Sequence, residues 1–156
     1  MNNIDSYRLE SEESDEALVR EKAYGLLSRR EYSARELAQK LGKWGPADLV
    51  EHVVCELRQA GAQSDERFAE MLCRSRYNNG KGPVRIRLEL SNHGIDEDLI
   101  QAALAPYSGE WRALAEQVRT RKFGEDAPTS YSEWARQARF LQQRGFGNEH
   151  ITGYED

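Results

Sequence analysis

The sequence is poor in cysteine and contains no long apolar run. Cys55 and Cys73 are its only cysteines among 156 residues, so a disulfide framework is not expected and the two thiols should be reduced in a cytoplasm. Because no stretch of about 18 apolar residues exists, we expect no membrane-spanning helix. The polar, acidic start of the chain argues against a secretory signal. These features are typical of a cytoplasmic protein, with no membrane partner and a monomer expected.

The sequence also lacks a recognisable catalytic or metal-binding pattern. Its three histidines, His52, His93 and His150, lie far apart. His52 and Cys55 have the spacing of half a metal site, but no second half follows. The basic turn at residues 80–82 follows no predicted strand and lacks the full phosphate-loop pattern. We therefore expect no enzymatic activity, no cofactor and no metal.

The net charge of −5 conceals an uneven distribution. Residues 1–21 hold seven acidic residues against Arg8 and Arg20, so this segment alone carries −5 and the remainder is neutral overall. Residues 67–87, in contrast, hold five arginines and Lys81 against the single acid Glu70. Such a basic stripe is either a solvated helical face or a surface that faces a polyanion or an acidic protein groove.

One pattern recurs three times, as an anchor residue, three others, a leucine, three others and then glycine. The copies are Leu37, Leu41, Gly45; Ile86, Leu90, Gly94; and Gln137, Leu141, Gly145. Their glycines are about 50 residues apart, a period typical of tandem structural repeats. Apolar residues at helical spacing precede and follow each copy. The sequence therefore predicts an all-α fold of three tandem three-helix units, about nine short helices.

Helix start and stop signals surround each copy. Ser33 with Glu36, and Ser130 with Glu133, have capping-box spacing, while the middle copy has Pro83 at the same place. Each terminal glycine is predicted to occupy the left-handed position after a helix. The expected organisation is an acidic, disordered extension at residues 1–16, followed by repeats at residues 17–62, 63–106 and 107–156.

The stretch GKGPVRIRLEL at residues 80–90 carries two conflicting signals. Val84, Ile86, Leu88 and Leu90 alternate with charged residues, as in a half-buried strand. A strand needs a partner, however, and no second alternating run exists in the sequence. The repeat spacing of Ile86 and Leu90 favours a helix, which leaves Val84 and Leu88 on another face.

The aromatic residues are mostly assigned to the core. Trp111 and Trp134 lie on apolar helical stripes, so both are expected to be buried. Phe140 lies on the polar side of its predicted helix. It is either a contact residue for a partner or is buried between repeats.

The first repeat is similar to a helix-turn-helix, in the segment SARELAQKLGKWGPADLVEHVVCEL. Such a motif would place its second helix in the major groove of DNA. That helix presents Asp48, Glu51 and Glu56 on its polar side, and these acids would repel phosphates. Sequence-specific DNA reading is therefore not favoured.

Several segments resemble the RecX family, bacterial regulators of the RecA recombinase. They are GKGPVRIRLELSNHGIDEDLI, SARELAQKL, SDERFAEMLCRSR, RKFGE and FLQQRGF, in the expected order over about residues 17–152. The resemblance implies an elongated, curved arrangement of the three-helix units and a non-catalytic protein. It also implies binding in the groove of the RecA–single-stranded DNA filament, with inhibition of filament extension, ATPase, strand exchange and co-protease activity. Roles in DNA repair, recombination and the SOS response would follow.

The candidate contact residues are basic, with one aromatic member. They are Arg74, Arg76, Lys81, Arg85, Arg87, Arg119, Arg121, Lys122, Arg136, Arg139 and Phe140. The expected partner is the RecA nucleoprotein filament, with weak binding of single- or double-stranded DNA also considered. The alternative function is a helical DNA-binding module that acts independently of RecA, which predicts tight, salt-dependent binding to bare DNA.

Overall fold

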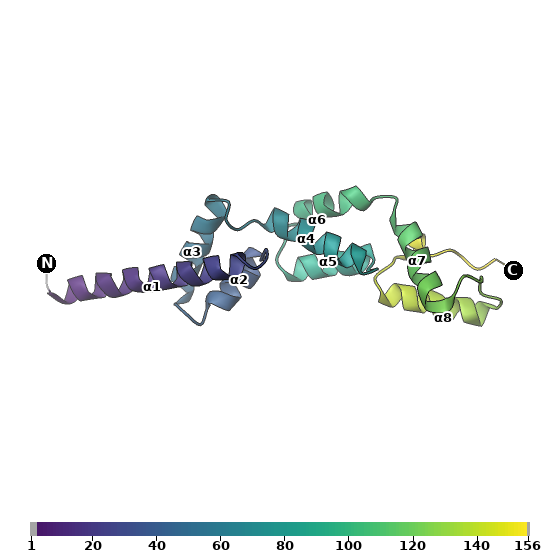
Figure 1. Cartoon of the computed structure of the whole chain (residues 1–156), viewed down its shortest axis with the longest axis horizontal. Helices are drawn as coiled ribbons and strands as arrows, with labels where there is room; N and C mark the ends of the chain where they lie inside the picture. The colour runs from purple at the N-terminus through teal and green to yellow at the C-terminus, as the bar shows by residue number, and fades with distance from the viewer. Residues whose placement is uncertain (1–2, 156) are drawn as a thin grey trace. The chain divides into compact units, whose positions relative to one another are not determined.

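The computed structural model describes residues 3–155, and within that range it is helical with no β-strand (Figure 1). It contains eight α-helices and two 3₁₀ segments. They are α1 (Asn3–Leu27), α2 (Ala34–Leu41), α3 (Ala47–Gln59), α4 (Asp65–Asn78), α5 (Pro83–Asn92), α6 (Glu97–Leu104), η1 (Ala105–Tyr107), α7 (Trp111–Phe123), α8 (Tyr131–Gln143) and η2 (Asn148–His150). The predicted all-α class is confirmed. The elongated, curved arrangement and the repeat boundaries stay predictions.

The last predicted helix, from Asn148 onward, is present only as the three-residue 3₁₀ helix η2. Ile151 has extended backbone, and residues 152–155 belong to no helix. Gly153 lies in this stretch, and glycine disfavours continuation of a helix. None of the helices between residues 3 and 155 is both long enough and apolar enough to cross a lipid bilayer.

Residues 83–90 are helical, as the repeat spacing predicts. Pro83 occupies the first turn of α5, where its missing N–H leaves no hydrogen bond unmade. Ile86 and Leu90 are fully buried, whereas Val84 and Leu88 are 56% and 60% exposed. The alternation of apolar and charged residues at positions 84–90 therefore lies on a helix, and the predicted helix is confirmed.

The first compact unit (Met1–Phe68) contains α1, α2 and α3, which pack around one apolar core. Leu37 and Leu41 of the first repeat copy are fully buried in it. Ser33 caps α2, since its Oγ accepts a hydrogen bond from the Glu36 N–H at 3.1 Å. The capping box predicted here is therefore confirmed at its serine.

The prediction that each repeat glycine is left-handed is wrong for Gly45. Gly94 and Gly145 adopt φ of +75° and +99°, as predicted for the left-handed position, but the φ of Gly45 is not positive. A Cβ on Gly45 would lie 3.0 Å from Cγ2 of Val19 in α1. Close packing against α1 explains the glycine in the first copy.

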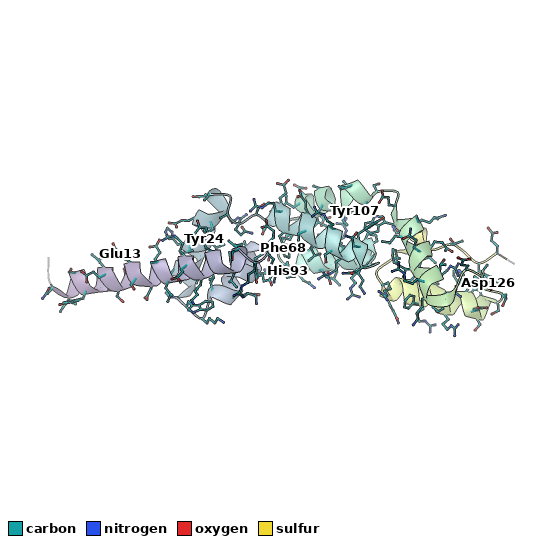
Figure 2. The ribbon with its side chains drawn as sticks, in the orientation of Figure 1. Glu13, Tyr24, Phe68, His93, Tyr107 and Asp126 are labelled. Atoms are coloured by element: carbon teal, nitrogen blue, oxygen red, sulfur yellow. The ribbon has the colours of Figure 1, made fainter. Side chains whose placement is uncertain are left out.

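Residues 3–16, within the segment expected to be disordered, are helical in the structure, where α1 begins at Asn3, while residues 1 and 2 of that segment lie outside the described residues. Residues 3–15 are exposed, and the side chain of Glu13 projects outward from the helix (Figure 2). Arg8 and Glu12 form an i,i+4 ion pair at 3.4 Å, which supports the helix locally. No glycine or proline interrupts α1 before Gly25, so the helix propagates outward from its core-anchored half.

The second compact unit (Ala69–Asp156) holds most of α4 and all later elements. The rings of Tyr77, Tyr107 and Trp111 pack together, with centroids 4.6–5.8 Å apart. Trp111 is buried, as predicted. Trp134 is only half-buried, and its indole N–H donates to the Thr152 carbonyl at 2.8 Å, so its assignment to the core is corrected.

Candidate binding surface

The basic turn between α4 and α5 has a defined conformation. Gly80 adopts a φ of +73°, in the left-handed region, and the Lys81 N–H donates to the Arg76 carbonyl at 2.9 Å. A Cβ on Gly80 would lie 2.9 Å from Cγ2 of Val118 in α7. Gly80 is therefore required by the left-handed backbone and by its close packing against α7. Lys81 alone supplies a charged side chain at residues 79–82.

The end of α8 packs directly on this turn. The Gly82 N–H donates to the Arg144 carbonyl and the Val84 N–H donates to the Gly145 carbonyl, both at 2.9 Å. A Cβ on Gly82 would lie 2.3 Å from the carbonyl carbon of Gly145, so only glycine allows this approach. The contact brings Arg144 beside Lys81.

Four cations, from α4, α5, the turn between them and the end of α8, meet at this contact. We call Arg76, Lys81, Arg85 and Arg144 the basic cluster. Partial burial, followed by the charges of Arg144 and Arg85, lowers the pKa of Lys81. Among acids, Glu89 faces the cluster: its carboxylate lies 2.7 Å from Nε of Arg76 and 3.8 Å from Nε of Arg85. Four cations against one carboxylate leave a formal charge of +3.

Two phenylalanine rings extend the basic cluster along α7 and α8. Phe123 and Phe140 meet edge to face, with centroids 5.4 Å apart. Arg144 and Lys122 lie over the Phe140 ring at 5.2 and 5.7 Å from its centroid. Arg136 lies 5.8 Å from the Phe123 centroid. Phe140 is half-buried, so it contributes both to packing and to this surface.

The other candidate residues lie in different surroundings. Arg74 is exposed on α4, and its charge acts on Tyr107. Arg87 pairs with Glu97 at the start of α6. The Arg119 side chain is only 12% exposed and bonds Glu116, Gln137 and two loop carbonyls, which gives it a structural role in the packing of α7 against α8. Arg121 and Arg139 are exposed on the surfaces of α7 and α8.

An exposed apolar pair lies next to the basic cluster on α5. Val84 and Leu88 flank Arg85 and Arg87 along the helix, and the Val84 end opens into a groove of about 470 Å³. Pro83, Leu104 and Trp111 line part of this groove. Exposed apolar side chains of this size beside concentrated positive charge are typical of a surface that contacts a macromolecule.

The arrangement provides charge and aromatic contacts rather than a reaction centre. Guanidinium and ammonium groups bind carboxylates and phosphates through charge-assisted hydrogen bonds. Of the predicted basic residues, the structure brings Arg76, Lys81 and Arg85 together, and it adds Arg144, which was not among the predicted contact residues. The only signal for Arg144 was its position directly before the repeat glycine Gly145.

Comparison with known proteins identifies the family. Three family models match consecutive parts of the chain: RecX, first three-helix domain, at residues 20–57; the second at residues 64–104; and the third at residues 110–153. The regulatory protein RecX of Stenotrophomonas maltophilia (strain R551-3) is 42% identical over 132 residues, covering 84% of this chain and 81% of that protein. The regulatory protein RecX of Halorhodospira halophila is 43% identical over 134 residues, covering 85% and 83%.

Solved structures agree on the fold. A crystal structure of regulatory protein RecX superposes with a TM-score of 0.82 at 21% identity, covering 96% of this chain and 76% of that one. The crystal structure of RecX from Lactobacillus salivarius superposes with a TM-score of 0.71 at 25% identity, covering 88% and 92%. On the strength of the three matched domains and the sequence identities, this chain belongs to the RecX family of regulatory proteins.

Proposed function

We propose that this chain is a negative regulator of the RecA recombinase. It binds the groove of the RecA–single-stranded DNA filament and restrains filament extension, ATP hydrolysis, strand exchange and co-protease activity. It acts by binding, without catalysis and without a cofactor, as a cytoplasmic monomer. Membership of the RecX family supports this function.

The observation that carries the proposal is the basic cluster beside exposed apolar residues. Its formal charge of +3 lies on a segment whose backbone is held by two hydrogen bonds, so the backbone positions that carry the cations are set before any partner arrives. Positive charge at such a surface accelerates association with an acidic groove or with phosphates, and the effect weakens as salt rises. Val84 and Leu88 add apolar area that is buried only in the complex.

Covalent linkage of the three-helix segments explains how weak contacts become effective. Once one segment binds a filament subunit, the others reach neighbouring subunits at a raised effective concentration. Contacts made to successive subunits oppose the relative movements that accompany hydrolysis and exchange. Regulation then requires no single strong site.

A double charge reversal tests the role of the basic cluster. Lys81→Glu with Arg85→Glu changes the cluster by −4 and leaves the Cβ of Arg85, which faces Gly145, in place. Half-inhibition of the filament ATPase is expected to need roughly tenfold more protein, equivalent to ~1.4 kcal/mol of binding free energy.

The matched control carries the same charge change in the first unit, as Arg29→Glu with Lys40→Glu. Both of these residues are exposed. The control is expected to inhibit much more strongly than the cluster variant. Equal inhibition by the two variants would exclude the basic cluster as the contact.

A second function remains in competition, a DNA-binding module that acts without RecA. The observation in its favour is the pairing of cations with Phe123 and Phe140, because aromatic rings and basic side chains together bind single-stranded nucleic acid. That function predicts tight binding to bare DNA that falls steeply with salt. The RecA function predicts weak binding to bare DNA.

A further inference from the structure

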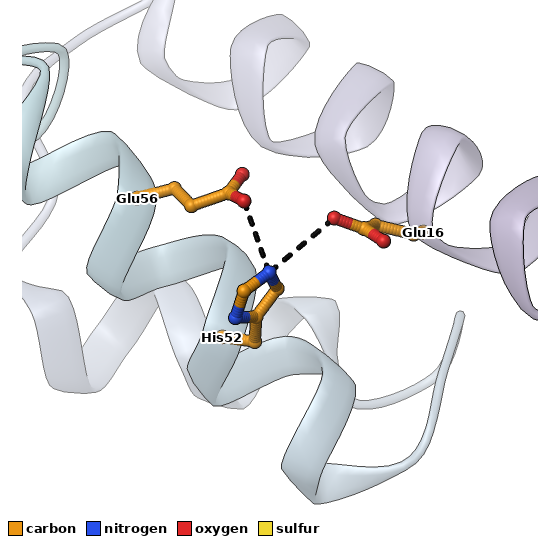
Figure 3. A group of neighbouring side chains, drawn as sticks. All are labelled: Glu16, His52 and Glu56. Carbon is orange, nitrogen blue, oxygen red and sulfur yellow. Dashed lines mark ion pairs between the residues drawn. The ribbon is translucent and has the colours of Figure 1, made fainter.

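A mixed group of metal-binding side chains lies on the first unit, remote in sequence from the basic cluster. One carboxylate oxygen each of Glu16 (α1) and Glu56 (α3) faces Nε2 of His52 (α3) (Figure 3). His52 Nε2 lies 2.9 Å from Oε1 of Glu56 and 3.5 Å from Oε1 of Glu16. All three ligand atoms lie within 4.8 Å of one another.

The fold positions these side chains on two packed helices. His52 and Glu56 are one turn apart on α3, so they share a face. Glu16 is one turn before Arg20 on α1, the helix whose Val19 and Ala23 are buried in the same core as Val53. The three ligands therefore come from regular helices packed on one core rather than from flexible loops.

We infer that Glu16, His52 and Glu56 form a binding site for a divalent transition-metal ion of the zinc class. One imidazole nitrogen with two carboxylate oxygens is a ligand set that zinc accepts, with a fourth position left for water. Hard cations such as magnesium would not favour the imidazole. The site links α1 to α3, so a bound ion stabilises the first unit.

Two of the three ligand-atom distances are close to those of a zinc site, and the third, between the Glu16 and Glu56 oxygens, is at most 4.8 Å. Two ligand atoms bound to one tetrahedral zinc at about 2.0–2.1 Å lie roughly 3.3 Å apart. The Glu16–His52 pair, at 3.5 Å, is already at that spacing. The His52–Glu56 pair, at 2.9 Å, must open by a few tenths of an ångström, which a side-chain rotation on the exposed face of α3 provides.

Arg20 is the neighbouring charge that a metal ion must accommodate. Its Nη2 lies 2.7 Å from Oε1 of Glu16 and 2.7 Å from Oε2 of Glu56. Because Arg20 bonds Oε2 of Glu56, Oε1 remains directed at His52. Repulsion between the guanidinium and the ion makes the site weaker than one built from three unpaired ligands.

Isothermal titration of the full chain with zinc chloride at about pH 7.5 tests the site. One zinc ion per chain is expected, together with a zinc-dependent rise in the melting temperature. His52→Ala and Glu16→Gln, both at solvent-accessible side chains, should each weaken binding roughly tenfold or more and remove the rise in melting temperature.

Two control variants separate this site from other zinc ligands. Cys55→Ser removes the exposed thiol one turn from His52, and His150→Ala removes a histidine that pairs with Glu149 in the second unit. Both should bind zinc like the unmodified chain. The site is refuted if the unmodified chain binds no zinc, if His52→Ala or Glu16→Gln binds it unchanged, or if Cys55→Ser alone abolishes binding. This test is independent of the proposed function, because it requires no RecA.

Discussion

Replacement of Gly82 by alanine tests the contact that assembles the basic cluster. Gly82 has φ −85° and ψ 168°, values that alanine adopts without strain. Its added Cβ, however, would lie 2.3 Å from the carbonyl carbon and oxygen of Gly145 and 2.5 Å from the backbone nitrogen of Phe146. All three are backbone atoms, so the end of α8 has to move away as a whole.

The magnitude follows from the hydrogen bonds that this movement breaks. The Gly82–Arg144 and Val84–Gly145 bonds are each expected to contribute ~0.5–1.5 kcal/mol, so their loss costs about 1–3 kcal/mol. At 1.4 kcal/mol per factor of ten, hydrogen exchange at the Val84 amide should accelerate about 5- to 150-fold. Gly153→Ala serves as the control, because nothing lies within 4 Å of its added Cβ.

Native-state hydrogen exchange and urea unfolding of both variants provide the measurement. Gly82→Ala should lose Val84 protection and unfold at lower urea, whereas Gly153→Ala should match the unmodified chain in both measurements. If the Val84 amide in Gly82→Ala keeps its original protection, the close backbone contact between α5 and the end of α8 is not as described.

Two further predictions follow from burial. Ile86→Ala, at a fully buried position of α5, should lower the free energy of unfolding by about 2–5 kcal/mol. Leu88→Ala, on the exposed face of the same helix, should lower it much less. Equal losses of stability in urea unfolding would contradict the helical register. Burial raises the pKa of Cys73 to about 11, so at mildly alkaline pH a thiol reagent should modify the exposed Cys55 first and Cys73 only after unfolding. A native chain that reacts at both thiols equally fast would contradict the burial of Cys73. Because the Cys73 pKa is raised in the folded state, its contribution to the free energy of unfolding should be retained below about pH 9 and be lost as pH rises through about 11.

The repeat pattern predicted most of the fold, because its anchor residues and caps depend on local periodicity. Leu37, Leu41, Ile86 and Leu90 are fully buried as predicted. The third-copy anchor Gln137 is also buried, where its amide oxygen accepts a hydrogen bond from Arg119. Polar character at that position therefore reflects a hydrogen-bond partner that sequence spacing does not reveal.

Two features that the sequence did not predict depend on contacts between segments distant in sequence. Gly45 packs against Val19, which lies 26 positions earlier in the chain, so the repeat alone could not reveal its role. Arg144 joins the basic cluster only because Gly82 and Gly145 approach closely. The proximity of Glu16 to His52 likewise has no signal in local spacing, since it depends on α1 packing beside α3.

Co-sedimentation of the chain with preformed RecA–single-stranded DNA filaments tests the proposed function most directly. The comparison is bare single-stranded DNA at the same physiological salt. The chain is expected to sediment with the filament and to remain largely in the supernatant with bare DNA. The Lys81→Glu, Arg85→Glu variant should sediment less with the filament than its Arg29→Glu, Lys40→Glu control. Equal sedimentation with filament and bare DNA, or none with the filament, would contradict regulation through filament binding.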